Sequence, residues 1–157
     1  MSQRYSIRPL LRNEWEEAMR LAWDTFMIYE APDYTLKGVQ SFKEFIHDPK
    51  LKKMFLKGDY LAWGAFENGI MIGLVSVRNR SHISLLFVDT DHHRQGVATA
   101  LLQTLFCFEK NEMDISEVTV NAAPYATAFY HKIGFADLDE EKVTDGIRYT
   151  PMIIRLR

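Results

Sequence analysis

Residues 87–102 read FVDTDHHRQGVATALL, in which an apolar stretch passes through a polar loop into a segment that begins with small residues. The first turn of a helix has unpaired backbone N–H groups, and its dipole favours an anion there. Gly96 and Ala98 would let a phosphate approach that backbone, and Arg94 adds positive charge nearby. The segment therefore predicts a strand, a phosphate-binding turn and a helix. It is not a P-loop, because no Gly-Lys-Ser/Thr follows at the required spacing.

Around this unit the sequence predicts strands and helices in one domain, residues 1–157. Apolar spacing indicates a first helix from Asn13 to about Tyr29, and Ser41 is predicted to cap a second helix after a loop over residues 31–39. The Lys-rich residues 50–57 are interpreted as a solvated helix end or loop. The later helices are predicted at 96–110 and from 124 to 134, and the strands at 5–8, 60–66, 70–77, 82–88, 117–120, 135–138 and 148–156.

The order of these segments indicates the fold class. The Asn68-Gly69 pair predicts a hairpin turn in the middle of the chain. A helix joins strands 82–88 and 117–120, so we expect these strands to be parallel neighbours. The sequence thus predicts an α/β (α+β) protein with a mixed, twisted sheet of about seven strands flanked by about four helices.

Two segments resemble the GNAT superfamily of N-acetyltransferases. Residues 93–98, HRQGVA, resemble its pyrophosphate motif of Gln or Arg, two residues, Gly, one residue, then Gly or Ala, except that His93 stands at the first position. Residues 118–135, VTVNAAPYATAFYHKIGF, resemble its late block, in which a strand, an Asn and small residues precede a helix that ends Phe-Tyr-x-x-x-Gly-Phe. Residues 146–152 also resemble a small subgroup of bacterial members. The resemblance implies the GNAT acyl-CoA N-acyltransferase fold, with acetyl-CoA as cosubstrate and no metal.

The resemblance also implies roles for individual residues. The backbone N–H of Val88 would polarise the thioester carbonyl, and Tyr130 would protonate the departing sulfur. The residues expected to bind acetyl-CoA are Leu86, Phe87, Val88, His93, Arg94, Gln95, Gly96, Val97, Ala98, Thr99, Asn121 and Tyr130. Without the resemblance, Asn121 could simply cap a helix and Tyr130 could be a core aromatic residue.

The general base is not fixed by these motifs. An alkylammonium, with a pKa near 10.4, must lose a proton before its nitrogen can attack. The candidates are Glu30, Asp33, His82 and Asp89, and we favour Glu30 because the first helix borders the acceptor site in this fold. The acceptor pocket is expected between the first two helices, their loop and the central hairpin, a region that holds Trp23, Phe26, Tyr29, Tyr34 and Trp63.

Composition excludes several other classes. The formal net charge is −2 and no basic stripe is visible, which argues against nucleic-acid binding. No apolar run approaches the roughly 20 residues of a membrane span, and no signal peptide is recognisable, so we expect a cytoplasmic protein without a membrane partner. The one cysteine, Cys107, is expected to be buried. The histidines lack the spacing of a zinc motif, so no metal site is expected.

Several questions stay open at this level. The acceptor is expected to be a small-molecule or peptide amine, which the sequence does not identify. Dimers are common in the family, and the oligomeric state is open. A non-catalytic acyl-CoA-binding sensor with the same fold, or an interaction domain that binds no CoA, are the alternatives to an enzyme.

Overall fold

The computed structural model describes residues 4–157, which form one eight-stranded sheet and five α-helices. The sheet has the order β1-β2-β3-β4-β5-β8-β6, and β7 pairs with β8. Its strands are β1 (Ser6–Pro9), β2 (Leu61–Glu67), β3 (Ile70–Arg78), β4 (His82–Val88), β5 (Glu117–Ala122), β6 (Ala136–Asp137), β7 (Lys142–Thr144) and β8 (Ile147–Arg155). The helices are α1 (Trp15–Tyr29), α2 (Leu36–Ile46), α3 (Pro49–Lys57), α4 (Val97–Asn111) and α5 (Thr127–Ile133). The predicted fold class is confirmed.

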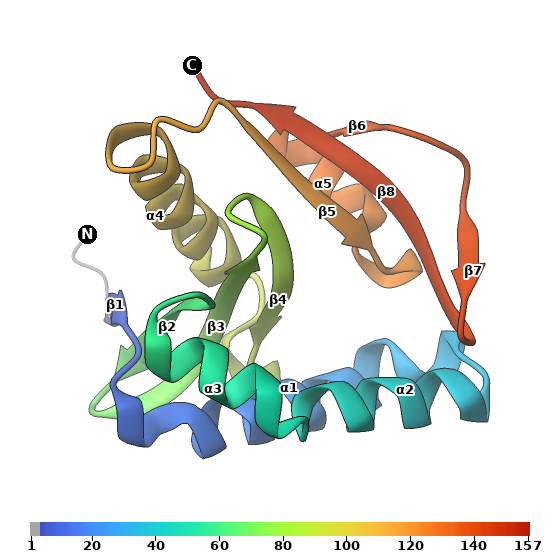
Figure 1. Ribbon diagram of the computed structural model, residues 1–157, viewed down its shortest axis with the longest axis horizontal. Coiled ribbons are helices and arrows are strands. Elements are labelled where there is room, and N and C mark those ends of the chain that lie inside the picture. The colour runs from blue at the N-terminus through green and yellow to red at the C-terminus, as the bar shows by residue number, and fades with distance from the viewer. Residues whose placement is uncertain (1–3) are drawn as a thin grey trace.

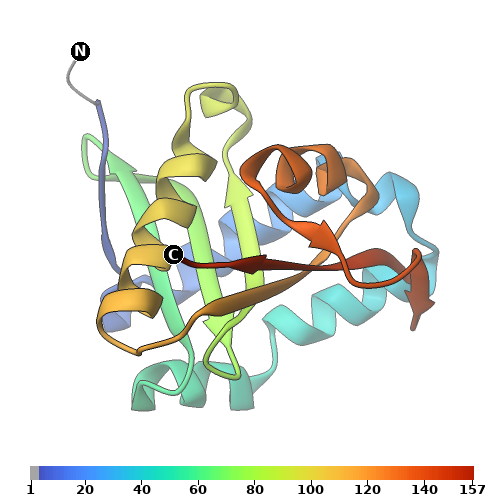
Figure 2. The ribbon, with the colours of Figure 1, turned by 90° about the horizontal axis from the view of Figure 1, so that it is seen from above.

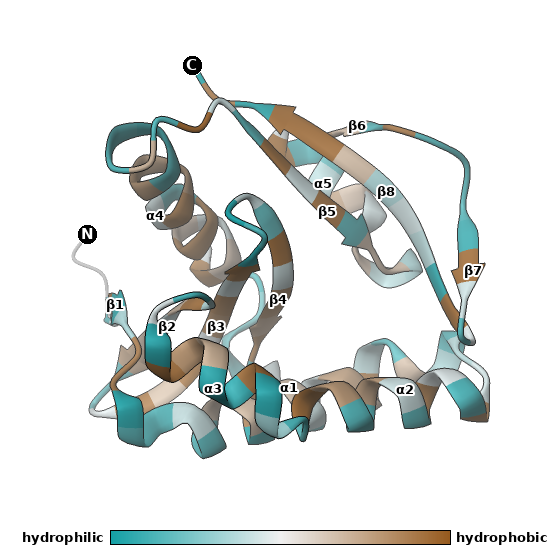
Figure 3. Cartoon of the chain, in the orientation of Figure 1, coloured by the Kyte–Doolittle hydropathy of each residue, from teal (hydrophilic) through white to brown (hydrophobic). Residues whose placement is uncertain are grey.

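The helices cover both faces of the sheet (Figures 1 and 2). Helices α1, α2 and α3 lie on one face, where Phe26, Ile46 and Leu51 join one hydrophobic core. Helices α4 and α5 lie on the other, where Leu101 and Tyr130 belong to a second core. Figure 3 shows apolar residues along the central strands β3 and β4 and hydrophilic residues along α3. Two cores separated by the sheet fix which helices can line a cavity on each face.

Strands β4 and β5 are parallel neighbours, as predicted, but they pair only at their beginnings. His82 is opposite Thr119 and Ile83 is opposite Val120, and the paired stretch ends there. On the other edge of β4, Val77 of β3 faces Ile83 while Ser76 faces Leu85, so Ser84 is an extra residue. Such a bulge bends its strand. The bend coincides with the divergence of β4 from β5, and the ends of both strands are left free to contact a ligand.

The second helix begins earlier than the sequence analysis predicts. Residues 31–39 are not a loop throughout, because α2 starts at Leu36 with Thr35 as its N-cap. The Thr35 hydroxyl accepts a hydrogen bond from the Gly38 N–H at 3.2 Å, which satisfies one of the free first-turn donors. Ser41 therefore lies inside the helix, where its hydroxyl donates to the carbonyl of Asp145 at 3.2 Å. The predicted Ser41 cap is wrong.

Three further differences concern single segments. The Lys-rich residues form the complete helix α3, capped by the Asp48 carboxylate and ended by Gly58. Strand β7 was not predicted, since its three residues carry no apolar alternation. Cys107 is exposed rather than buried, because it lies on the outer side of α4 between two partly buried phenylalanines.

Candidate active site

The end of β4, beyond the point where it diverges from β5, borders a cavity of about 900 Å³, which we call the groove cavity. It is lined by the end of β4, the loop after it, the start of α4 and one side of α5. Among the residues expected to bind acetyl-CoA, those that line it are Leu86, Phe87, Val88, His93, Arg94, Gly96, Val97, Ala98, Thr99 and Tyr130. Ten of the twelve expected residues thus lie around one space. Gln95 is exposed beside it, and its side-chain amide donates to the Asp91 carbonyl at 3.3 Å.

The start of α4 presents an open backbone to this cavity. Gly96 is the N-cap with φ 78°, and no side chain caps the first turn. A Cβ on Gly96 would meet nothing within 4 Å, so the space in front of the helix end is free. Unpaired N–H groups, the helix dipole and the neighbouring Arg94 all favour an anion at this point. The start of α4 thus has free backbone donors and open space in front of them, which are the features on which the expected phosphate site rests.

His93 has a structural partner. Its Nε2 lies 2.7 Å from the Val88 carbonyl oxygen, which can only accept, so Nε2 carries the hydrogen. The ring also stacks on Tyr29 at 4.7 Å between centroids, and Tyr29 stacks on Tyr125 at 4.8 Å. His93 therefore links the loop to the end of β4 by a hydrogen bond and to α1 by ring stacking. The Gln or Arg usual at this position has no aromatic ring with which to stack on Tyr29.

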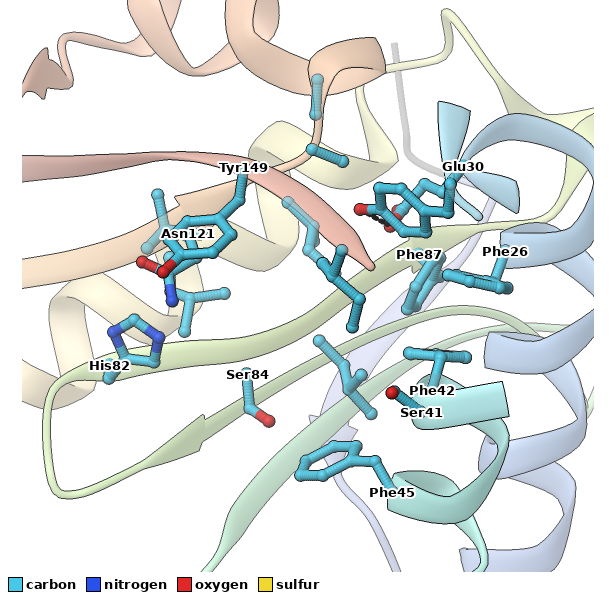
Figure 4. Close-up of a pocket in the computed structure, with 18 of the residues that line it drawn as sticks. Phe26, Glu30, Ser41, Phe42, Phe45, His82, Ser84, Phe87, Asn121 and Tyr149 are labelled. Carbon is cyan, nitrogen blue, oxygen red and sulfur yellow. Dashed lines mark hydrogen bonds between the residues drawn. The ribbon is translucent and has the colours of Figure 1, made fainter. Parts of the chain in front are cut away.

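A second cavity, of about 490 Å³, lies on the side of the sheet covered by α1 and α2, and we call it the acceptor-side cavity. One wall is aromatic: Phe26 stacks on Phe42 at 4.0 Å, and Phe42 meets Phe87 edge-on at 5.9 Å. The polar and charged side chains that line it are Glu30, Tyr34, Ser41, Arg78, His82, Ser84, Asn121, Tyr130, Thr144, Asp145 and Tyr149. Figure 4 shows the aromatic rings near Glu30 and the polar groups His82 and Ser84 at the opposite end. The cavity suits a ligand with an apolar body and a polar end.

The two cavities meet at a small set of shared residues. Both are lined by Glu30, Leu86, Phe87, Ala126 and Tyr130. Glu30 follows the last turn of α1, and Tyr130 belongs to α5 on the other side of the splayed strands. An acidic and a phenolic side chain therefore stand where a ligand in one cavity would touch a ligand in the other.

Burial changes the acid–base properties of these two groups. Loss of solvent raises the pKa of Glu30 to about 7, although a hydrogen bond from the Tyr34 hydroxyl, 3.4 Å from Oε1, partly opposes that rise. Burial, and next the nearby Glu30, raises the pKa of Tyr130 above its usual range. Glu30 can therefore gain and lose a proton near neutral pH, and Tyr130 stays protonated until it meets a strongly basic partner.

The other candidate bases lie elsewhere. Asp33 and Asp89 line neither cavity, and Asp89 is held 3.2 Å from His92. His82 lines the acceptor-side cavity, but burial, with a smaller contribution from Arg78, lowers its pKa to about 4. Its Nδ1 lies 2.8 Å from the Thr119 hydroxyl. Of the four candidates, only Glu30 borders both cavities.

The expected acceptor aromatics separate into groups. Phe26 and Tyr34 line the acceptor-side cavity, and Tyr29 lines the groove cavity. Trp23 packs behind Phe26 and Phe42 at 6.0 and 6.5 Å. Trp63 faces the opposite side of the sheet, where it contacts Phe108 of α4 at 5.1 Å. The expectation that the hairpin lines the pocket is wrong except for Arg78 at the end of β3.

The sequence analysis missed some lining residues. Phe42 and Phe45 of α2 form part of the wall of the acceptor-side cavity and are not among the aromatic residues expected there. Arg78 follows the predicted strand 70–77 directly, and the alternation of that strand places it on the same face as Ser76. Asn121 caps no helix: it lies in β5, and its side chain borders the acceptor-side cavity. The sequence offered no signal for Tyr149.

Residues 30–156 match the family model described as the acetyltransferase (GNAT) domain. The chain belongs to the GNAT acetyltransferase family. It is 38% identical over 81 residues to the Escherichia coli (strain K12) protein named uncharacterized N-acetyltransferase YafP. That match covers 52% of this chain and 49% of YafP, so this GNAT chain aligns with about half the length of that relative.

Solved GNAT structures share the fold. A GCN5-related N-acetyltransferase from Rhodopseudomonas palustris has a TM-score of 0.84 at 21% identity, over 99% of this chain and 98% of that one. The PaiA N-acetyltransferase of Thermoplasma acidophilum, solved in complex with coenzyme A, has a TM-score of 0.79 at 21% identity, over 99% of both chains. A spermidine N-acetyltransferase SpeG chimera from Vibrio cholerae and hSSAT has a TM-score of 0.69 at 16% identity, over 98% of this chain and 96% of that one.

Neither a membrane-spanning helix nor a metal-binding cluster of side chains occurs within residues 4–157. No helix there is both long and apolar enough to span a bilayer. No group of three or more His, Cys, Asp or Glu side chains is arranged to hold a metal ion in that range.

Proposed function

We propose that this protein is an N-acetyltransferase that moves the acetyl group of acetyl-CoA to a primary amine. The observation that carries the proposal is the junction of the two cavities, where Glu30 and Tyr130 stand on opposite sides of the place at which a thioester and an amine would meet. The coenzyme A complex of the Thermoplasma acidophilum relative, which has the same fold, supports the choice of cosubstrate.

Acetyl-CoA would occupy the groove cavity. Its pyrophosphate would lie on the backbone of Gly96 to Thr99, beside Arg94 and Gln95. Its pantetheine arm would enter the gap between β4 and β5, where the unpaired backbone of Leu86 and Phe87 can bond to its amides as an added strand would. The end of β5 at Asn121 would border the arm from the other side. The N–H of Val88 would then donate to the thioester carbonyl and stabilise the oxyanion.

The chemistry would be a direct transfer through a tetrahedral intermediate. Glu30 takes a proton from the ammonium group, and the amine nitrogen attacks the thioester carbonyl carbon. When the intermediate collapses, the carbon–sulfur bond breaks, Tyr130 gives its proton to the sulfur, and the second proton that the nitrogen loses returns to the tyrosine oxygen by way of solvent. A base with a pKa of about 7 suits this task, because a large fraction is ionised at neutral pH while its proton affinity stays useful.

The acceptor would be a small-molecule or peptide amine that enters the acceptor-side cavity. We further infer that residues 1–157 act as a single domain in the cytoplasm, without a nucleic-acid or membrane partner. A homodimer, the common assembly in the family, is compatible with this arrangement of the site.

Thermal unfolding with acetyl-CoA tests the first half of the proposal. At 100 times its dissociation constant, a ligand adds about 2.7 kcal/mol of stability. Gly96→Glu should lose this response, since its carboxylate would occupy and repel the phosphate position. Gly58→Glu is the matched control, because Gly58 also has positive φ and open space around it but lies at the end of α3.

Release of CoA with a panel of amines tests the second half. The proposal expects acetyl-CoA to stabilise the protein and at least one amine to accelerate CoA release. Stabilisation without release for any amine would indicate the acyl-CoA sensor instead. The absence of any stabilisation by acetyl-CoA would count against both functions.

A further inference from the structure

The acceptor-side cavity has opposite charges at its two ends. Glu30 lies at the junction with the groove cavity, and Figure 4 shows His82 at the far end. Arg78 also lines this cavity and is the partner of His82 in the pairing of β3 with β4. Asp145, the other carboxylate that lines this cavity, has a cation of its own, Lys37, at 3.6 Å. The charge of Arg78 is thus left available to a ligand.

The guanidinium of Arg78 lacks a partner within residues 4–157. Its Nε is buried and makes no hydrogen bond there. Arg78 also forms no ion pair in this range, whereas Arg8, Arg148 and Arg155 each do. A buried donor without an acceptor costs free energy, and this cost is recovered when an anion binds.

Neighbouring strands surround Arg78 with neutral polar groups. Arg78 is opposite His82 in the pairing of β3 with β4, and His82 is opposite Thr119 of β5. Asn121 lies two residues beyond Thr119 on the same face, and Tyr149 of β8 is diagonal to it. The lowered pKa of His82 keeps its ring neutral. This row can donate hydrogen bonds to an anion without adding a competing negative charge.

We propose that the amine acceptor carries a carboxylate at the far end of an apolar body and that Arg78 binds this carboxylate. The proposal rests on the acetyltransferase function and specifies its substrate class. The row of Arg78, His82, Asn121 and Tyr149 holds the acid. The rings of Phe26, Phe42, Phe45 and Phe87 contact the body, and the amine reaches Glu30.

The length of the cavity restricts the spacing of the two groups. From His82 to Phe87 the strand covers at most roughly 16 Å at 3.3 Å per residue, and the bulge at Ser84 shortens this span. Glu30 and Arg78 lie towards opposite ends of this span, so an acceptor that contacts both carries its amine and its carboxylate at opposite ends of an apolar chain. A polyamine is disfavoured, because its second ammonium group would meet Arg78. The acceptor class is therefore an ω-amino acid or a compound with similarly separated groups.

Matched amine pairs test this proposal by turnover. The pairs are 6-aminohexanoate with hexylamine and 8-aminooctanoate with octylamine, which differ only in the carboxylate. We expect kcat/KM at least tenfold higher for the acid of one pair or both, and a ratio near one in Arg78→Gln. Arg20→Gln, which removes an exposed arginine elsewhere, should keep the wild-type ratio. Equal kcat/KM within both pairs, or an unchanged ratio in Arg78→Gln, would overturn the proposal.

A binding measurement separates this proposal from the acetyltransferase function. Calorimetry with CoA present should show 6-acetamidohexanoate or 8-acetamidooctanoate binding at least tenfold more tightly to wild type than to Arg78→Gln. The uncharged N-alkylacetamides should bind both proteins alike. Discrimination in binding without turnover of any amine would refute the enzyme and keep the anion site, whereas no discrimination would refute the anion site. If Arg78→Gln does not fold, Arg78→Lys replaces it, with a partial loss of preference expected.

Discussion

Two carboxyl groups on opposite faces of the sheet have the same raised pKa in different settings. Burial raises the pKa of both Glu30 and Glu109 to about 7. Glu30 ends α1, borders both cavities and accepts a hydrogen bond from Tyr34. Glu109 lies in α4 with 0% of its surface exposed, and neither of its oxygens has a hydrogen-bond partner in residues 4–157.

Because Glu30 and Glu109 share a raised pKa, such a shift does not by itself mark a catalytic group. Glu109 borders neither the groove cavity nor the acceptor-side cavity, so no ligand in them can exchange a proton with it. The charge of Arg80 is the only influence that lowers its pKa. Access to a reacting group, added to the pKa, is what distinguishes Glu30.

The largest expected effect is on turnover when Glu30 is replaced. Glu30→Gln removes the base and should lower kcat at least about 100-fold, within the usual contribution of general-base catalysis. Acetyl-CoA affinity, measured by calorimetry, should change less than about threefold, since the phosphate-binding turn is untouched. Glu109→Gln is the matched control and should retain turnover. An equal loss of turnover in both variants would show that Glu30 has no catalytic role that Glu109 lacks.

A smaller kinetic effect is expected at Tyr130. Tyr130→Phe removes the proton donor to the sulfur and should lower kcat about 10- to 100-fold, with acetyl-CoA affinity nearly unchanged. Stopped-flow or steady-state CoA release measures the first quantity and calorimetry the second. Full turnover in Tyr130→Phe would show that water or another group is the acid.

The pH dependence of turnover sharpens the assignment of Glu30. The base must be ionised, so kcat should rise about tenfold per pH unit below pH 7 and level off above it, following the raised pKa of Glu30. Glu30→Gln should abolish this acid limb, and Glu109→Gln should preserve it. If the acid limb disappeared in Glu109→Gln, the titrating group would be Glu109 and not Glu30.

The smallest expected effect is a gain in stability at Glu109. Its pKa is higher in the folded than in the unfolded chain, so the folded state binds the proton more tightly. The ionisation penalty is therefore absent below about pH 4.5 and grows as the pH rises towards 7. Glu109→Met should raise the free energy of unfolding by about 1–3 kcal/mol at pH 8 and by less at pH 5, measured by urea denaturation. A stability loss at pH 8 would indicate that the carboxylate has a partner in solution.

Local patterns in the sequence predicted most of the fold and the groove cavity. The segments at 87–102 and 118–135 each combine a strand end, small residues and a helix start, so the chemistry of the turn could be derived from neighbouring residues. The parallel pairing of β4 and β5 followed from the helix between them. Glu30 was favoured for its place after the first helix, and the structure adds its position at the junction.

The structural features that the sequence did not predict depend on contacts between residues far apart in the chain. The extra residue Ser84 in β4 is visible only when β3 is placed beside it. Alternation assigned Trp63 to one face of a strand without saying which helix covers that face. Arg78 belongs to no motif, and its place in the acceptor-side cavity follows only from the packing of α2, β5 and β8 around that cavity. Gly38 lies in the first turn of α2 and packs against Gly146, which is more than a hundred residues away in the chain.

The close contact between Gly38 and Gly146 controls the position of α2 and thereby the acceptor specificity of the enzyme. A Cβ on Gly38 would collide with the carbonyl group of Gly146, and one on Gly146 would collide with the backbone of Gly38 and with Thr35. Even one added methyl group must push α2 away from the turn that precedes β8, and α2 forms a wall of the acceptor-side cavity. The start of α4 has no part in this contact. A single glycine can thus set the width of the acceptor-side cavity while the groove cavity stays unchanged.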